Sequence, residues 1–366
     1  MLNINTKIVN LITVLITLII IELISQGIVL KFEKKYSILL KTFFNNTEVV
    51  EIGAYQIKWD YNNHKMQPGK YQNKYTTYNI NSKGFRGKEF NTEKNKVRIL
   101  VFGGSTTLGL RSPDDKTYPA QLEDLLNHSN KDYEVINMGF ISKSLKFIKN
   151  LFFLEAYKYN PDLIVIYSNR NTMMYDGSSI EPDFENSKLL QVNFFLQDNI
   201  MSYRLMWKIY KRILNNSLRV EYLKSPFQKK GISEKFLLDG YKNSLKELIE
   251  FSGKRNIKVV LVKQAYNFEP NIINELNSFS VGELIKRYKE DFFLKKYKLT
   301  EEANFWVVIG TVLNKNLDKF SSYPNVIVVD PINELLNSKN NFTDYVHLSI
   351  KGNAVLAENI YKSIID

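Results

Sequence analysis

The stretch Arg98-Ile-Leu-Val-Phe-Gly-Gly-Ser-Thr-Thr-Leu-Gly109 decides the fold of this chain. Its four apolar residues after Arg98 predict a short buried strand, and the two glycines that follow permit a tight turn that larger residues resist. Ser105 comes directly after this turn, at the carboxyl end of the predicted strand. Because ligands bind at the carboxyl ends of the strands in an open α/β sheet, Ser105 is either a polar turn residue or a nucleophile.

A second informative stretch, Asp344-Tyr-Val-His347, lies near the C-terminus. Asp and His at this spacing can meet on one side of a loop, where the carboxylate orients the imidazole and stabilises its protonated form. The imidazole can then take the proton of a serine hydroxyl. The other two histidines, His64 and His128, lie in polar stretches and are interpreted as solvated. His347 is therefore the candidate base.

Strands and helices alternate from Arg98 to the C-terminus. Five apolar runs predict strands, at residues 99–102, 135–138, 163–167, 257–263 and 325–330. Helical spacing of apolar residues predicts helices between and after them, at residues 118–126, 143–159, 233–252 and 348–365. This alternation predicts an α/β fold with a five-stranded parallel sheet and helices on both of its faces.

Four separated blocks of the chain resemble those by which the SGNH (GDSL-type) hydrolase superfamily is recognised, in particular its membrane-anchored bacterial branch. In chain order the blocks are residues 103–109, 137–139, 169–172 and 344–347. Gly104 stands in place of the Asp that usually precedes the serine, and Asn169 and Thr172 replace the usual Gly and Asp of the third block. Four blocks in order at strand ends are a fairly specific pattern. The resemblance covers about residues 79–366.

This resemblance implies a three-layer α/β/α, flavodoxin-like fold and an acyl-serine mechanism. Ser105 would be the nucleophile, His347 the base, and Asp344 the group that orients the base. The oxyanion hole would consist of the backbone N–H groups of Ser105 and Gly139 and the side-chain amide of Asn171. No cofactor is implied, and the sequence shows no His-rich cluster that would indicate a metal site.

Further polar residues flank these blocks. Tyr167 and Arg170 are candidates for substrate contact, although a surface role for Arg170 is an equal alternative. The segment Asn81-Ser-Lys-Gly-Phe-Arg-Gly87 resembles one that commonly precedes the nucleophile strand in the membrane-anchored branch. Within it we favour packing for Phe85 and a surface ion pair for Arg86 over substrate contact.

An apolar run at residues 8–30 predicts a transmembrane helix behind a short tail at residues 1–7. The run is long enough to cross a hydrocarbon core about 30 Å thick, and no small-x-small cleavage site follows it. More lysines flank its C-terminal side than its N-terminal side, which favours a cytoplasmic position for the rest of the chain. The resemblance implies the opposite, a single-pass anchor with the catalytic domain outside the cytoplasm. We follow the resemblance, because large domains translocate largely regardless of flanking charge.

The rest of the chain is expected to form a juxtamembrane stalk or cover at residues 31–91 and a hydrolase-like domain at residues 92–366, with a helical insertion at about 172–231. Residues 189–214 are rich in aromatic and aliphatic side chains, with basic residues toward the end. This segment is either a helix packed on the sheet edge or a lid that shapes an acyl or glycan pocket at a membrane surface.

Composition narrows the classes of partner. A chain of 366 residues with 44% apolar content can bury a full core. It has no cysteine, which excludes disulfides and thiolate metal sites. The net charge of +12 comes from scattered lysines, and since no nucleic-acid motif accompanies them we do not expect a nucleic-acid partner. A basic surface can still favour anionic headgroups or an anionic glycan.

The function implied by the resemblance is that of a membrane-anchored carboxylic ester hydrolase acting on O-acyl, chiefly acetyl, esters of a cell-surface or secreted carbohydrate. Alternatives are a lipase or lysophospholipase-like esterase, an O-acyltransferase, and a non-catalytic glycan-binding or assembly protein on the same fold. The expected partners are thus an acylated carbohydrate or lipid ester and, through residues 8–30, the membrane.

Overall fold

The computed structural model describes residues 17, 20–22, 47–52, 55–60, 65–72, 75–128, 132–141, 143–168, 171 and 234–365. The chain divides into two compact units, the first made of residues 1–50, 58–65 and 181–225, the second of residues 51–57, 66–180 and 226–366. The first unit lies almost entirely outside the described residues. The second holds the main sheet and every residue of the predicted triad.

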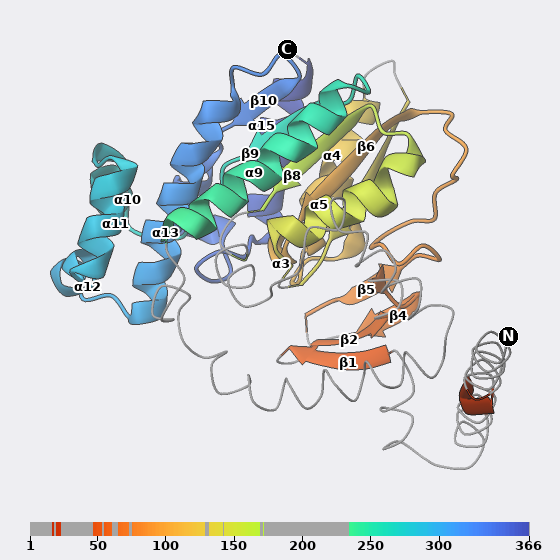
Figure 1. The fold of residues 1–366 in the computed structure, drawn as a ribbon, viewed down its shortest axis with the longest axis horizontal. Helices are drawn as coiled ribbons and strands as arrows, with labels where there is room; N and C mark the ends of the chain where they lie inside the picture. Colours follow the sequence, from red (N-terminus) through yellow and green to blue (C-terminus); the bar gives the residue numbers. More distant parts are fainter. Residues whose placement is uncertain are drawn as a thin grey trace, which may run out of the picture. The chain divides into compact units, whose positions relative to one another are not determined.

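A five-stranded parallel sheet forms the centre of the second unit (Figure 1). Its strands are β6 (Val97–Gly103), β7 (Tyr133–Gly139), β8 (Leu163–Tyr167), β9 (Lys258–Val262) and β10 (Val326–Val329). They lie in the order β10-β9-β8-β6-β7. With β6 counted as the first strand, this is the flavodoxin-like order 2-1-3-4-5. The predicted parallel sheet is therefore confirmed, and all five of its strands fall where the apolar runs place them.

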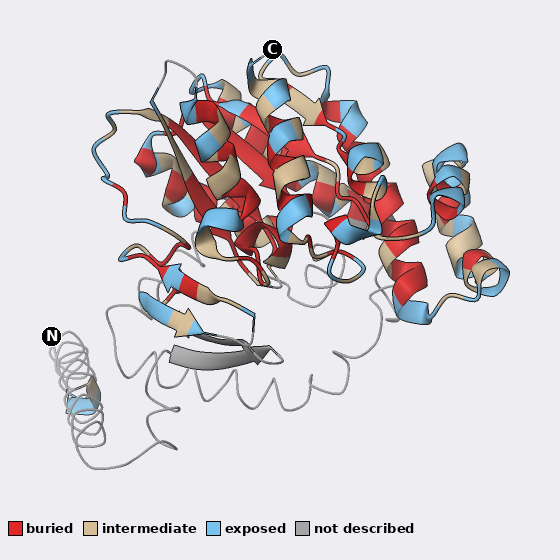
Figure 2. Cartoon of the chain, turned by 180° about the vertical axis from the view of Figure 1, so that it is seen from behind, coloured by how far each residue is buried: buried red, intermediate tan, exposed pale blue. Residues whose placement is uncertain are grey.

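Helices cover both faces of this sheet. Alternate residues of a strand point to opposite faces, so Ile99 and Val101 of β6 join an apolar cluster with α4 (Tyr118–Asn127) and α15 (Ile350–Ile365). On the other face Phe102 packs edge-to-face on Phe152 of α5 (Leu145–Leu154), with ring centroids 5.9 Å apart. Phe251 of α9 (Glu234–Gly253) contacts the same Phe152 ring at 5.7 Å. Figure 2 shows the result, a buried sheet between helices whose outer faces are exposed.

The structure describes further helices, short turns and N-terminal strands. The other helices are α3 (Ser105–Leu108), α10 (Pro270–Ser278), α11 (Val281–Lys289), α12 (Phe292–Tyr297), α13 (Glu301–Leu317) and α14 (Ile332–Leu336). Short 3-10 turns are η1 (Asp114–Lys116), η2 (Ala156–Tyr159), η4 (Asp318–Phe320) and η5 (Lys339–Asn341). The N-terminal strands are β1 (Thr47–Ile52), β2 (Tyr55–Asp60), β3 (Lys65–Met66), β4 (Gly69–Gln72) and β5 (Thr77–Ile80). Strands β4 and β5 pair as an antiparallel hairpin.

One predicted helix differs from the structure. The helix expected over residues 143–159 is α5 followed by the separate 3-10 turn η2. Ser144 caps its start by accepting a hydrogen bond from the backbone N–H of Phe147. At its end Asn160 takes a left-handed conformation with φ of 53°, and a proline follows. A proline disfavours helical geometry in the residue before it, so the helical stretch ends there.

Several predictions fall outside the described residues. Residues 8–30 are described only at positions 17 and 20–22. In the described part of the chain, none of the helices combines the length and the apolar character that a membrane crossing requires. The anchor and its orientation therefore stay predictions. The expected insertion at 172–231, including the segment 189–214, and the residues Arg170 and His64 also lie outside the described residues.

Candidate active site

Ser105 begins α3 immediately after β6, at the carboxyl edge of the sheet. The turn requires glycine at position 103, because a Cβ there would overlap the hydroxyl of Thr107 and lie 2.5 Å from the carbonyl oxygen of Tyr167. Gly103 is paired with Tyr167 on the neighbouring strand β8. Because the ends of β6 and β8 approach closely, the serine hydroxyl lies at the carboxyl edge of the sheet. Strands that are far apart in the sequence end at this edge.

The three residues predicted as a triad lie in hydrogen-bond contact. The Asp344 Oδ2 atom is 2.8 Å from His347 Nδ1, and His347 Nε2 is 2.8 Å from Ser105 Oγ. Because a carboxylate only accepts hydrogen bonds, Nδ1 carries the proton that is donated to Asp344. Nε2 is then free to accept the proton of the serine hydroxyl. The geometry is that of a nucleophile, a general base and a group that orients the base.

The Asp344 carboxylate is held by the loop that carries it. Its Oδ1 atom accepts hydrogen bonds from the backbone N–H groups of Val346, at 3.0 Å, and His347, at 2.8 Å. Burial opposes ionisation of the group, but the hydrogen bonds and charge of His347 and the two backbone donors outweigh it. The pKa of Asp344 is therefore lowered well below its ordinary value. Asp344 stays ionised wherever the site would work.

Arg111 is a further neighbour of the triad that the sequence did not single out. Its Nη2 atom lies 3.3 Å from Asp344 Oδ2, and its Nη1 atom donates to the carbonyl oxygen of Thr343 at 3.0 Å. Its guanidinium carbon also lies 5.2 Å from the centre of the Tyr75 ring. Arg111 thus connects the loop after α3, which follows the nucleophile, to the loop that carries the acid and base.

Arg86 was expected in a surface ion pair and is instead buried, with 3% of its surface exposed. It does pair with Asp114, at 2.7 Å. Its other nitrogens donate to the carbonyl oxygens of Leu108, Gly109 and Ser112 at 2.5 to 2.6 Å. Leu108 is the last residue of α3 and Gly109 is its C-cap, so these two carbonyls lie at the helix end, where partners within the helix are lacking, and Ser112 lies in the loop that follows. Arg86 therefore stabilises the turn after α3 and does not act as a substrate contact.

Two of the three predicted oxyanion donors lie at the nucleophile turn. The backbone N–H of Ser105 is the first of α3, and the first N–H groups of a helix have no partner within it. The side-chain nitrogen of Asn171 lies beside Gly104, since a Cβ built on this glycine would be 2.7 Å from it. Glycine at position 104 therefore leaves the space in which the Asn171 amide approaches the nucleophile turn.

Gly139 has a different role in the structure. Its backbone N–H donates to the side-chain oxygen of Asn137 at 3.0 Å, and the Asn137 nitrogen donates to the carbonyl of Thr107 at 2.9 Å. A Cβ on Gly139 would overlap the backbone nitrogen of Leu108. The N–H that we expected to face the oxyanion already has an acceptor, so the geometry supports packing of β7 against α3 and not a third oxyanion donor.

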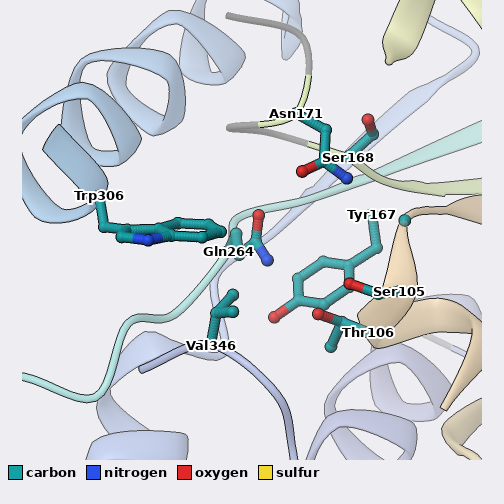
Figure 3. Close-up of a pocket in the computed structure, with 9 residues that line it drawn as sticks. Ser105, Thr106, Tyr167, Ser168, Asn171, Gln264, Trp306 and Val346 are labelled. Carbon is teal, nitrogen blue, oxygen red and sulfur yellow. The ribbon is translucent and has the colours of Figure 1, made fainter. Parts of the chain in front are cut away.

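A pocket opens beside the serine (Figure 3). It is a small pocket that is open to solvent. Its walls are formed by Gly104, Ser105, Thr106, Tyr167, Ser168, Asn171, Gln264, Trp306 and Val346. Tyr167, predicted as a substrate contact, forms part of the wall, and its ring packs edge-to-face on Tyr118 with centroids 5.8 Å apart. Burial raises the pKa of Tyr167, so its hydroxyl stays protonated.

Gln264 and Trp306 are pocket residues that the sequence analysis missed. Gln264 comes two residues after β9 ends, so its place at a strand end is a signal that could have identified it. Trp306 lies in α13, whose sequence has no motif that connects it to the serine. Among the described residues there is no group of three or more His, Cys, Asp or Glu side chains that could hold a metal ion.

No protein-family model and no curated protein sequence matches this chain at a significant level. Solved structures do resemble it. A protein assigned to the G-D-S-L lipolytic family of Desulfitobacterium hafniense is 10% identical, with 73% of this chain and 99% of that chain covered and a TM-score of 0.40. An acetyl xylan esterase is 15% identical, with 73% and 100% covered and a TM-score of 0.41. A catalytic mutant of an acetylxylan esterase of Geobacillus stearothermophilus is 14% identical, with 74% and 94% covered and a TM-score of 0.41.

Proposed function

We propose that this protein is a serine ester hydrolase of the SGNH (GDSL) type that removes short O-acyl groups, chiefly acetyl, from a cell-surface or secreted carbohydrate. The observation that carries the proposal is the row Ser105, His347 and Asp344, in which each joining distance is 2.8 Å. A hydroxyl, an imidazole and a carboxylate in this order activate a serine for attack on an acyl carbon.

The reaction follows from this row. Ser105 Oγ attacks the ester carbonyl carbon while its proton passes to His347 Nε2, and Asp344 stabilises the imidazolium that forms. The negative charge on the carbonyl oxygen is held by the N–H of Ser105 and the amide of Asn171. When the tetrahedral species collapses, His347 returns the proton to the departing alcohol oxygen and an acyl-serine remains. Water, deprotonated by His347, then attacks the acyl carbon. When the bond from this carbon to Ser105 Oγ breaks, His347 gives the proton to Oγ, and the carboxylic acid leaves.

The pocket in Figure 3 is the acyl side of this site. Its walls include Ser105 and Asn171 but not His347. Because His347 must protonate the departing oxygen, the alcohol lies beside the imidazole, and the pocket next to Ser105 and Asn171 is left for the acyl group. A small pocket that is open to solvent suits a short acyl group.

An exposed aromatic ring in the loop that carries the base favours a carbohydrate as the alcohol. Tyr345 lies between Asp344 and His347 in sequence and is 47% exposed. Its ring is stacked on Phe268, with centroids 5.5 Å apart and planes inclined by 9°. A flat aromatic face carries partial negative charge and suits the polarised C–H bonds of a sugar ring. Tyr345 offers such a face within the loop that carries the base.

We also propose that residues 8–30 anchor the enzyme in the membrane and that its catalytic domain lies outside the cytoplasm. The long apolar run supports the anchor, and the family resemblance supports the orientation. Since the chain has no cysteine, the variant Ser321→Cys carries a single reactive thiol. Labelling of this thiol in spheroplasts by an impermeant maleimide would support the orientation, and labelling only after lysis would contradict it.

The enzymatic proposal is tested with the purified full-length protein on p-nitrophenyl acetate, butyrate and octanoate, and on acetylated xylan with release of acetate as the measurement. We expect turnover of the acetate ester, loss of turnover in Ser105→Ala, and unchanged turnover in the exposed control Ser321→Ala. A fluorophosphonate probe should label the wild type and the control but not Ser105→Ala.

Other outcomes identify the alternatives. A rate that rises toward octanoate would favour a lipase-like enzyme. Acetyl transfer to an added sugar in preference to water would favour an O-acyltransferase. No turnover and no labelling, with glycan binding that Ser105→Ala leaves unchanged, would contradict catalysis and favour a non-catalytic glycan-binding protein.

A further inference from the structure

Gln264 is a buried polar residue in the wall of the acyl pocket that the mechanism does not use. It follows β9 at the carboxyl edge of the sheet and is 7% exposed. Its backbone N–H donates to Asn314 Oδ1 at 3.0 Å, and its carbonyl accepts from Asn314 Nδ2 at 2.9 Å. Two hydrogen bonds to one side chain fix the backbone here, so the direction in which the Gln264 side chain leaves it is also fixed.

The two ends of the Gln264 amide have different surroundings. Its oxygen accepts a hydrogen bond from the hydroxyl of Tyr266 at 3.4 Å. Its nitrogen points toward the part of the pocket where Tyr167 and Ser105 lie (Figure 3), and within the described part of the chain it has no hydrogen-bond acceptor. A buried amide thus presents its N–H groups to the space that the acyl group would occupy.

Filling this space has opposite consequences for two kinds of acyl group. A hydrocarbon chain displaces water from the amide nitrogen and leaves a buried donor without an acceptor. An oxygen at the same position of the chain accepts the hydrogen bond. A buried donor that loses its acceptor typically costs the equivalent of about 5- to 150-fold in a rate or binding constant. An acetyl group ends at its methyl carbon, so it leaves more of the space beside the amide to water than a longer acyl group does.

We propose that Gln264 determines acyl specificity, and that the pocket takes short acyl groups which either carry an acceptor oxygen beyond the ester carbonyl, such as hydroxyacyl or alkoxyacyl groups, or are small enough to leave water on the amide. This inference rests on the proposed ester hydrolysis. It extends that proposal by naming the chemical class of acyl group that the site selects.

The test compares two esters of nearly equal shape, p-nitrophenyl methoxyacetate and p-nitrophenyl butyrate, which differ by an ether oxygen in place of a methylene group. The measured quantity is the ratio of their kcat/KM values, methoxyacetate over butyrate. Comparing this ratio between variants of the full-length protein cancels the difference in chemical reactivity between the two esters. The change in this ratio from wild type to variant therefore reports the effect of the pocket alone.

Two variants remove the donor in different ways. Gln264→Met keeps the length and shape of the side chain and removes the whole amide. Gln264→Glu keeps an oxygen for Tyr266 and replaces only the nitrogen, so it serves as the second measurement if Gln264→Met does not fold. Gln121→Met is the matched control, because it makes the same change at a residue that does not line the acyl pocket. Gln121 lies on α4, and its amide nitrogen donates to the carbonyl of Lys116 at 2.9 Å.

We expect the ratio to fall about 5- to 150-fold in both Gln264 variants, the range for a buried donor with and without its acceptor, and to stay unchanged in Gln121→Met. A ratio within twofold of wild type in the Gln264 variants, with active wild-type enzyme, would overturn the role of Gln264 and leave the proposed hydrolysis intact. A wild-type protein that cleaves p-nitrophenyl acetate but neither of these two esters would overturn the inference on Gln264 alone. One that cleaves none of the three esters would overturn both proposals.

Discussion

Replacing Gly104 by alanine is expected to displace Asn171 and so to remove one oxyanion donor. The backbone of Gly104 is extended, with φ of −87° and ψ of −151°, and alanine can adopt it without strain. The new Cβ, however, would lie 2.7 Å from the Asn171 side-chain nitrogen. An ordinary van der Waals separation is about 3.5 Å or more, so the amide must move away by nearly an ångström.

The size of the effect follows from the geometry that an oxyanion donor requires. Such donors act at 2.7 to 3.1 Å from the oxyanion, and loss of one typically lowers kcat by about 10²- to 10³-fold. We therefore expect a fall of up to this size in Gly104→Ala. The fall should appear in kcat more than in KM, since the donor acts mainly in the transition state.

Steady-state kinetics on p-nitrophenyl acetate, with Gly104→Ala, Asn171→Ala and the double variant, measures this effect. If both changes act through one amide, the double variant should be no slower than Asn171→Ala alone. Gly282→Ala is the control, because a Cβ there has no neighbour within 4 Å. A kcat for Gly104→Ala within threefold of wild type, or losses that multiply in the double variant, would refute the argument.

Two further predictions concern the Asp344 carboxylate. The pKa of Asp344 in the folded protein lies below the ordinary value of 3.8. The ionised carboxylate therefore stabilises the fold above about pH 3.8, and this contribution is lost as the pH falls toward the lower pKa of the folded state. Urea unfolding should show a loss of stability between pH 6 and pH 2.5 that is smaller in Asp344→Asn than in the wild type. Arg111→Met removes a partly exposed ion pair with Asp344 that is worth at most about 1 kcal/mol. We therefore expect kcat/KM to fall by about fivefold or less. A loss near 10⁴-fold, the size expected when the triad carboxylate itself is missing, would contradict this.

The local pattern of the chain was enough to predict the parallel sheet, although it did not predict helices α10 to α13. The apolar runs at residues 99–102 and 163–167 coincide with strands β6 and β8, and the alternation of strands with helices predicted a parallel sheet. These features depend on interactions between neighbours in sequence and on which residues avoid water. The predicted triad could be identified for a related reason, because its members Ser105, Asp344 and His347 lie in short sequence blocks. Ser105 follows a strand and a glycine turn, and the three-residue spacing of Asp344 and His347 allows the carboxylate to orient the imidazole.

Tertiary structure decided what surrounds those residues. Gln264 and Trp306 share a pocket with Ser105 although more than 150 residues separate them from it in sequence, and Arg111 reaches Asp344 from the loop after α3. Arg86 looked like a surface residue and is buried, and the N–H of Gly139 is held by Asn137. Contacts between side chains that are far apart in the sequence depend on the order of the strands and on the packing of chain segments against each other. A local sequence pattern does not predict either of these. The contact among Ser105, His347 and Asp344 could therefore be predicted from the sequence, whereas the residues that line the pocket beside Ser105 required the folded chain.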